Sequence, residues 1–356
     1  MKKFKGMLLL VFLVSFIIMN CKPGIEKKID KLFKNYSSKN VPGTSLKIIK
    51  DGMPVLTKSY GVANIEQKIL VKNNTNFRLA SFTKQFTAMC AAKLEEQGKI
   101  NFSQTLTEIF HHFPVYGKNI TINHLIHHTS GLIDYESLIP DTATIQVLDD
   151  DVLKMMMELD STYFPPGSKY KYSNSAYAVL AKIIEKISGI SFAHYLKENI
   201  FDPLGMKNTV AYEKGISEVK NRAFGYAVKN GEFVFKDQSL TSAVLGDGGI
   251  YSSVDDLFKW DQALYTDKLV RFETKQKIFT SGVLTDNTQT GYGFGWRLDE
   301  FKGHQRQHHT GSTCGFTTII QRYPEDNFTI IILTNRNKPM LNEIADGIAD
   351  LFLYSN

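Results

Sequence analysis

Cysteine is scarce in this chain, with only three among 356 residues. This scarcity excludes a disulfide scaffold, and the sequence also lacks the His-Glu-x-x-His and clustered Cys patterns of zinc sites. Charge of one sign is not in excess either, because 42 Lys and Arg stand against 36 Asp and Glu. Three lysines fall within the first five residues, so the remainder carries only 39 − 36 = +3. No nucleic-acid partner is indicated.

Repeats, low-complexity tracts and linkers rich in Pro, Gly or Ser are also missing. A composition of 43% hydrophobic and 22% charged residues is typical of a soluble globular protein and excludes disordered, collagen-like and polytopic membrane chains. The absence of separating linkers favours one discontinuous, two-lobed domain over residues 21–356. An active site is then expected in the cleft between the lobes.

The first 20 residues read as an export signal. Three lysines precede an apolar run over residues 7–19, which is shorter than the roughly 20 residues that span a bilayer as a helix. A retained membrane anchor helix is the alternative. The end of the run, Ile18-Met19-Asn20-Cys21, resembles a bacterial lipoprotein signal, although Asn20 stands where a small residue is usual. The resemblance implies a signal peptide over residues 1–20, lipidation of Cys21 and a place in the cell envelope, either periplasmic or membrane-anchored.

Cys90 and Cys314 are then the remaining cysteines. An exported protein could join them in a disulfide, but Cys90 lies on the apolar face of a predicted helix. The simpler interpretation is that both are unpaired and behave as small hydrophobic residues.

Hydrophobic periodicity divides the chain into a sheet lobe and a helical lobe. Strands are predicted over residues 44–49, 54–60, 304–309, 316–322 and 328–333, with an Asp51-Gly52 hairpin turn between the first two. Helices are predicted over residues 25–36, 82–97, 122–128, 176–187, 253–264 and 341–352. The predicted fold class is therefore α+β: an antiparallel sheet flanked by N- and C-terminal helices (about 25–80 and 290–356), with an inserted, mainly helical lobe (about 81–289).

The first candidate for chemistry is Ser81-Phe82-Thr83-Lys84 at the start of a predicted helix. A spacing of three residues places Ser81 and Lys84 on one helix face, so the amine can reach the hydroxyl and take its proton. The motif is short and occurs often by chance. A serine that caps the helix beside a solvated lysine is the alternative.

Two further segments carry polar groups suited to the same chemistry. Tyr172-Ser173-Asn174 lies just before a predicted helix, where a loop tyrosine can relay protons. His309-Thr310-Gly311-Ser312 lies on a predicted strand, where the glycine lets a ligand approach the backbone. Taken singly, a core tyrosine and a polar edge strand are equally reasonable interpretations.

Taken in order, these three segments resemble the active-site motifs of the serine β-lactamase and penicillin-binding protein superfamily, in the form of its class C-like members. The resemblance implies an α+β fold of the β-lactamase/transpeptidase type. It also implies roles for the candidate residues: Ser81 as the acyl-accepting nucleophile, Lys84 and Tyr172 as general base and acid, and Asn174, His309, Thr310, Gly311 and Ser312 as substrate-binding residues. The backbone N–H groups of Ser81 and Ser312 would form the oxyanion hole.

The sequence departs from the superfamily pattern at His309, where β-lactamases and transpeptidases usually carry lysine. Histidine is largely neutral at neutral pH, so a carboxylate-bearing β-lactam loses an attraction. We therefore expect an exported serine hydrolase, independent of metals and cofactors, that acts on small esters, amides or D-amino-acid peptides, with peptidoglycan as one candidate source of the substrate. The alternatives are a true β-lactamase or DD-peptidase, and a non-catalytic envelope protein that binds peptidoglycan or β-lactams. A metal site at His124 and His128 is a weaker alternative.

Overall fold

The computed structural model describes residues 23–337 and 339–354. The predicted signal peptide and the predicted lipidation at Cys21 lie outside the described residues. Within the described part, no helix combines the length and the apolar composition needed to cross a bilayer.

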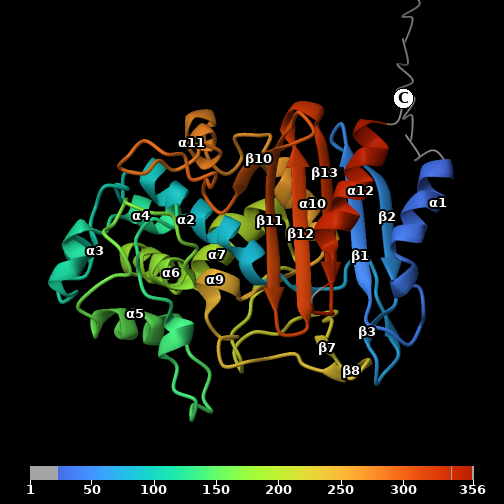
Figure 1. Cartoon of the computed structure of the whole chain (residues 1–356), viewed down its shortest axis with the longest axis horizontal. Helices are drawn as coiled ribbons and strands as arrows, with labels where there is room; N and C mark the ends of the chain where they lie inside the picture. Colours follow the sequence, from blue (N-terminus) through green and yellow to red (C-terminus); the bar gives the residue numbers. More distant parts are fainter. Residues whose placement is uncertain (1–22, 338, 355–356) are drawn as a thin grey trace, which may run out of the picture.

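A six-stranded antiparallel sheet forms one side of the molecule (Figure 1). Its strand order is β10-β11-β12-β13-β1-β2, so the C-terminal strand β13 pairs with the N-terminal strand β1. The strands are β1 (Thr44–Lys50), β2 (Met53–Tyr60), β10 (Arg297–Phe301), β11 (His304–Thr313), β12 (Phe316–Tyr323) and β13 (Phe328–Thr334). The two ends of the chain thus build one sheet, and the segment between them forms the rest of the molecule.

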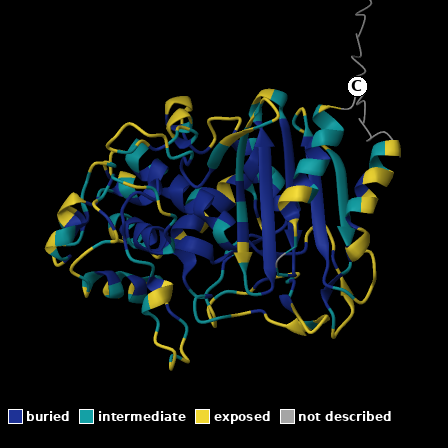
Figure 2. Cartoon of the chain, viewed as in Figure 1, coloured by how far each residue is buried: buried dark blue, intermediate teal, exposed yellow. Residues whose placement is uncertain are grey.

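Strand β13 is apolar on both faces, because each face of the sheet is covered by helices. Ile330 and Ile332 of β13 pack with Ile348 under the terminal helices α1 (Pro23–Leu32) and α12 (Leu341–Leu353). The alternating residues Ile331 and Leu333 face the opposite core, as period-two side-chain alternation requires. Helix α10 (Val254–Ala263) packs on that second face, against β1 and β13. Figure 2 shows these strands buried while the outer surfaces of the helices are exposed.

The inserted segment is mainly helical and lies beside β11 (Figure 1). Its α-helices are α2 (Lys84–Glu96), α3 (Leu106–Ile109), α4 (Ile122–Ile126), α5 (Asp149–Met157), α6 (Asn174–Ser188), α7 (Phe192–Leu196), α8 (Asp202–Leu204), α9 (Leu245–Gly248) and α11 (Phe272–Ile278). Its short 3₁₀ and π turns are η2 (Ala80–Thr83), η3 (Val115–Asn119), η4 (Tyr135–Leu138) and η5 (Lys197–Phe201), while η1 (Lys34–Tyr36) and η6 (Pro324–Asp326) belong to the sheet side. Minor sheets join β5 (Phe77–Arg78), β9 (Ile250–Ser252) and β6 (Val210–Ala211), β3 (Val62–Asn64) and β4 (Ile69–Leu70), and β7 (Tyr226–Lys229) and β8 (Glu232–Phe235).

The predicted fold class is confirmed, and the predicted strands and helices match observed elements with small shifts at their ends. Asp51 and Gly52 both have positive φ, as the predicted tight hairpin requires. The N-terminal helix ends at Leu32 and continues as a 3₁₀ turn, and the helix predicted from residue 82 begins with the 3₁₀ turn η2. Cys90 and Cys314 are unpaired, as the simpler interpretation expects, but only Cys90 is buried like a small hydrophobic residue, whereas Cys314 is half-buried.

Candidate active site

Ser81 lies in the 3₁₀ turn η2, which leads into α2. The preceding residue, Ala80, has a φ of 50°, a left-handed conformation that costs free energy for a residue with a Cβ. Two hydrogen bonds hold this segment from outside: Leu79 N–H donates to Ile250 O at 2.8 Å, and Thr318 Oγ1 donates to Leu79 O at 2.8 Å. The strained turn is therefore held in place by both β9 and β12, and the position of Ser81 is fixed with it.

Lys84 begins α2 and is completely buried. Its Nζ lies 3.2 Å from Ser81 Oγ, 2.9 Å from Asn174 Oδ1 and 2.9 Å from the backbone oxygen of Asp247. Once Nζ has given up its proton, it can still donate to the two carbonyl oxygens while its lone pair accepts the serine proton. The predicted Ser–Lys pairing is thus present in the geometry, with the amine directed at the hydroxyl.

The loop that carries Tyr172 is fastened to the segment around His128. Lys171 N–H donates to His128 O at 2.9 Å, and Ser173 N–H donates to His128 Nδ1 at 3.1 Å. Burial, followed by the charge of Lys84, holds the pKa of His128 well below its ordinary value of 6.5, so this ring stays neutral. The metal alternative at His128 loses support, because one ring nitrogen is occupied by a backbone donor.

Tyr172 itself lies between two cations. Lys84 Nζ is 4.9 Å from the centroid of its ring, and Arg297 Cζ is 5.7 Å from it. The Tyr172 hydroxyl oxygen is buried and has no hydrogen-bond partner among the described residues. No internal hydrogen bond therefore has to break for this hydroxyl to exchange a proton.

Asn174 is the first residue of α6 and links two parts of the site. Its Oδ1 accepts from Lys84, and its Nδ2 donates to Glu136 Oε1 at 3.0 Å. Ser173 caps the same helix by accepting from Ala176 N–H at 3.1 Å. The amide orientation is fixed from both ends, which suits the predicted role of orienting Lys84.

His309 of β11 is buried, with 1% of its surface exposed. Its Nδ1 lies 2.7 Å from Thr310 O, and its Nε2 lies 2.9 Å from the Tyr292 hydroxyl. Because a carbonyl oxygen only accepts, the proton belongs on Nδ1, and Nε2 accepts from Tyr292. Burial, followed by the charge of Lys84, holds the pKa of His309 well below 6.5. The expectation of a neutral group at this position is supported.

The strand that follows His309 comes very close to the serine turn. A Cβ on Gly311 would lie 2.0 Å from Leu79 O and 2.5 Å from Thr318 Oγ1, so only glycine fits here. Ser312 is exposed and lines a cavity together with Ser81 and Asn174. The remaining lining residues are Arg78, Ala80, Tyr135, Glu136, Thr241, Asp247, Gly248 and Thr313. The structure thus joins the predicted serine and strand segments around one cleft.

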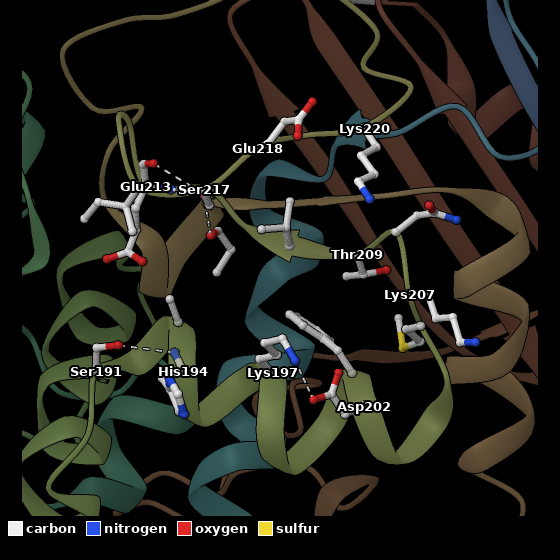
Figure 3. Close-up of a pocket in the computed structure, with 17 residues that line it drawn as sticks. Ser191, His194, Lys197, Asp202, Lys207, Thr209, Glu213, Ser217, Glu218 and Lys220 are labelled. Carbon is white, nitrogen blue, oxygen red and sulfur yellow. Dashed lines mark hydrogen bonds and ion pairs between the residues drawn. The ribbon is translucent and has the colours of Figure 1, made fainter.

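The cavity at Ser81 is smaller than other cavities of the molecule, so size alone would not select it as the active site. A larger cavity of about 390 Å³ lies between α7 and the segment around residues 207–220 (Figure 3), whereas the cavity at Ser81 measures about 40 Å³. Lys197 and Asp202 form an ion pair at 2.6 Å within the larger cavity. None of the predicted site residues lines it. The chemistry therefore belongs to the smaller cleft.

Within residues 23–337 and 339–354, no three His, Cys, Asp or Glu side chains form a group suited to a metal ion. His124 instead accepts from Thr121 N–H through Nδ1 at 3.2 Å and caps α4.

Comparisons with known proteins agree with this geometry. Residues 29–354 match the family model described as Beta-lactamase. This chain belongs to the β-lactamase family. Among its relatives, Penicillin-binding protein 4* of Bacillus subtilis (strain 168) is 33% identical over 332 residues, covering 89% of this chain and 73% of the relative.

The three-dimensional structure of this chain is also similar to solved structures of other proteins. The octameric penicillin-binding protein homologue from Pyrococcus abyssi is 27% identical, with a TM-score of 0.81 over 94% of this chain and 77% of that chain. The D-amino acid amidase from Ochrobactrum anthropi SV3, complexed with D-phenylalanine, is 21% identical, with a TM-score of 0.77 over 94% of this chain and 100% of its own. The second likeness supports the fold alone. Membership of the β-lactamase family supports a hydrolase of the serine type.

Four charged residues of the site were not identified from the sequence: Arg78, Glu136, Asp247 and Arg297. Glu136 and Asp247 line the cleft from η4 and α9, which are short elements without periodic patterns. Arg297 begins the polar edge strand β10. An acid in the Gly246–Gly249 segment and a cation next to Trp296 are visible in the sequence, but only the fold brings them to Ser81 and Tyr172.

Proposed function

We propose that this chain is an exported serine hydrolase that acts through a Ser81 acyl-enzyme on small esters, amides or D-amino-acid peptides. The contact between Lys84 Nζ and Ser81 Oγ carries this proposal, because it supplies an amine that can activate the nucleophile. The β-lactamase family membership supports the hydrolase type.

The proposed reaction has two halves. Ser81 Oγ attacks the substrate carbonyl while its proton passes to Lys84 or Tyr172, and the leaving alcohol or amine takes a proton from the same pair. Water then attacks the acyl-enzyme, gives its proton to the pair and releases the acid, with Ser81 regaining its hydrogen. The backbone N–H groups of Ser81 and Ser312 would stabilise the oxyanion at about 3 kcal/mol per donor.

The alternative that this chain is a true β-lactamase has less support. His309 is neutral and both its nitrogens are engaged, so it offers no fixed cation to a β-lactam carboxylate. A non-catalytic binding protein also has less support, because Ser81, Lys84 and Asn174 are joined by hydrogen bonds that a binder does not need.

The test is the intact mass of the purified protein after treatment with a fluorophosphonate, beside the Ser81→Ala variant. One adduct on the wild type and none on the variant is expected, together with loss of ester turnover in the variant. Absence of an adduct on folded wild-type protein would favour the binding protein. Turnover above a few per cent in Ser81→Ala would remove Ser81 from the role of nucleophile.

Export and anchoring rest on the sequence of residues 2–21, and a lipid on Cys21 would hold the hydrolase at a membrane. Full-length protein purified from the membranes of a bacterial host should begin at Cys21 and exceed the mass of residues 21–356 by the mass of the attached lipid, and Cys21→Ala should lack this added mass. An unmodified Cys21 in the wild-type protein would contradict lipidation.

A further inference from the structure

The cleft at Ser81 contains two carboxylates that acyl transfer does not require. Glu136 is exposed at its mouth, on η4, and Asp247 is 7% exposed, on α9. Both line the same small cavity as the nucleophile. With about 40 Å³ of space, this cavity admits only a few non-hydrogen atoms of a substrate beyond the reacting carbonyl.

The side-chain hydrogen-bond partners of these two carboxylates are neutral, and the charges that act on them, Lys84 on both and Arg78 on Asp247, do so without direct contact. Glu136 Oε1 accepts from the neutral amide of Asn174, and Asp247 Oδ2 accepts from the Tyr135 hydroxyl at 3.0 Å. Among residues 23–337 and 339–354, neither carboxylate has a Lys or Arg nitrogen within ion-pair distance. Two negatively charged hydrogen-bond acceptors therefore face the cleft, and their side-chain hydrogen-bond donors are neutral.

The cations of the cleft are directed elsewhere. Lys84 Nζ contacts Ser81, Asn174 and the backbone oxygen of Asp247, and not the Asp247 carboxylate. Arg78 donates to Ser242 O at 2.6 Å, and its guanidinium lies over the ring of Tyr251. An anionic substrate group in this cavity would face two carboxylates, whereas a cationic group would find two carboxylates that no Lys or Arg side chain contacts directly.

We propose that Glu136, supported by Asp247, binds the α-ammonium group of the substrate, so that the preferred substrates are aminoacyl esters or amides with a free amino group. This inference rests on the proposed function, since it places the scissile carbonyl at Ser81. The α-ammonium is separated from that carbonyl carbon by only the α-carbon, so it falls within the same cavity. Its three N–H groups suit carboxylate acceptors placed at the mouth and on the wall.

Glu136 also bonds Asn174, so the test must separate charge recognition from positioning. The substrates are the p-nitroanilides of alanine, as both enantiomers, of N-acetylalanine and of propionic acid, which lacks the amino group. For the purified wild-type protein, kcat/KM for one alanine enantiomer should exceed that for the propionyl compound by about 10- to 100-fold. The preference should decline above about pH 8, where the substrate ammonium loses its proton.

Glu136→Gln keeps an oxygen that can accept from Asn174 but removes the charge. We expect this variant to lose the preference, because kcat/KM falls by about 10- to 100-fold more for the alanine compound than for the propionyl compound, mainly through a higher KM. Asp141→Asn, an exposed acid of the same loop outside the cavity, is the matched control and should keep the preference.

Two outcomes would overturn the inference. One is equal wild-type kcat/KM for the alanine and propionyl compounds. The other is an equal loss for both compounds in Glu136→Gln, which would make Glu136 a positioning residue for Asn174. Failure of the proposed function differs from both, because no compound would then be hydrolysed and no fluorophosphonate adduct would form on Ser81.

Discussion

At the scale of single residues, Tyr172 offers the sharpest test of how protons move in the cleft. Its hydroxyl is buried without an internal partner, and its ring lies between Lys84 and Arg297. Removing the hydroxyl removes a proton relay while the ring contacts stay. Tyr172→Phe should therefore slow acylation by about 100-fold or more, measured as the burst rate of p-nitrophenol release from an activated ester.

The neighbouring Tyr170 provides the control, since its hydroxyl is also buried without a partner. Tyr170→Phe should leave the burst rate near that of the wild type, and both variants should melt near the wild-type temperature. A Tyr172→Phe burst rate equal to the wild-type rate would assign the whole proton transfer to Lys84.

The residues that could be predicted at this scale are those whose roles depend on local spacing. Ser81 and Lys84 lie three apart at a helix start, and Asn174 opens a helix that the sequence already indicated. Glu136 and Asp247 could not be predicted, because their approach to Ser81 depends on the course of loops between helices. The engagement of His309 by Tyr292 joins residues 17 positions apart and likewise emerges only in the fold.

At the scale of elements, the short helix α9 forms hydrogen bonds that hold the segments around Ser81 in place. Its first N–H groups, on Leu245 and Gly246, donate to the Asp149 carboxylate at 2.7 and 2.9 Å. Its backbone oxygens on Gly246 and Asp247 accept from Thr87 and Lys84 of α2. Helix α9 thus links α5 to α2 through hydrogen bonds. Its own four residues are too few to show helical periodicity in the sequence.

Titration of Asp247 makes the free energy of unfolding of the protein depend on pH. Burial, opposed by the charge of Lys84, raises the pKa of Asp247 from 3.8 to about 6. Tyr135, Glu136 and Arg78 are the other charged or titratable groups that act on it. Between pH 4 and pH 6 the folded protein keeps a proton that the unfolded chain releases, so this group makes the free energy of unfolding fall as pH rises, by about 2 kcal/mol.

Asp247→Asn removes that titration and retains an oxygen that can accept from Tyr135. Urea unfolding of both proteins at pH 4, 5, 6 and 7 measures the effect, and carboxylates common to both cancel in the difference. The variant should gain stability relative to the wild type from pH 4 to pH 6, and the difference should then stay constant. A difference that does not change over this range would show that Asp247 ionises at its ordinary pKa.

The long elements were predictable because their burial follows a period. Strand β13 has a continuous apolar core, β12 is buried along its whole length, and α6 and α12 each bury one face. Strand β10 was not predicted, because Arg-Leu-Asp-Glu-Phe lies at a sheet edge and stays half-exposed or exposed along its length. Burial on both faces of a strand leaves a strong pattern in a sequence, whereas an edge strand leaves a weak one.

At the scale of the whole molecule, the inserted segment is tied back to the sheet by α10. Asp261 of this helix is fully buried, and Arg322 of β12 is 1% exposed. Arg322 Nε donates to Asp261 Oδ1 at 2.7 Å, and Thr329 Oγ1 of β13 donates to the same oxygen at 2.9 Å. The insertion and the sheet therefore share a buried charge pair, and we expect them to unfold together.

Breaking one side of this pair should destabilise the whole protein. Arg322→Met leaves the Asp261 carboxylate buried without its cation and should cost about 3–5 kcal/mol of unfolding free energy, measured by urea denaturation. The double variant Arg322→Met with Asp261→Leu should recover most of that loss, because no unpaired charge remains. Lys302→Ala, which breaks the exposed pair with Asp350, is the control and should cost under about 1 kcal/mol. If Arg322→Met instead produced two separate transitions, the sheet and the inserted segment would be independent folding units joined only by the chain.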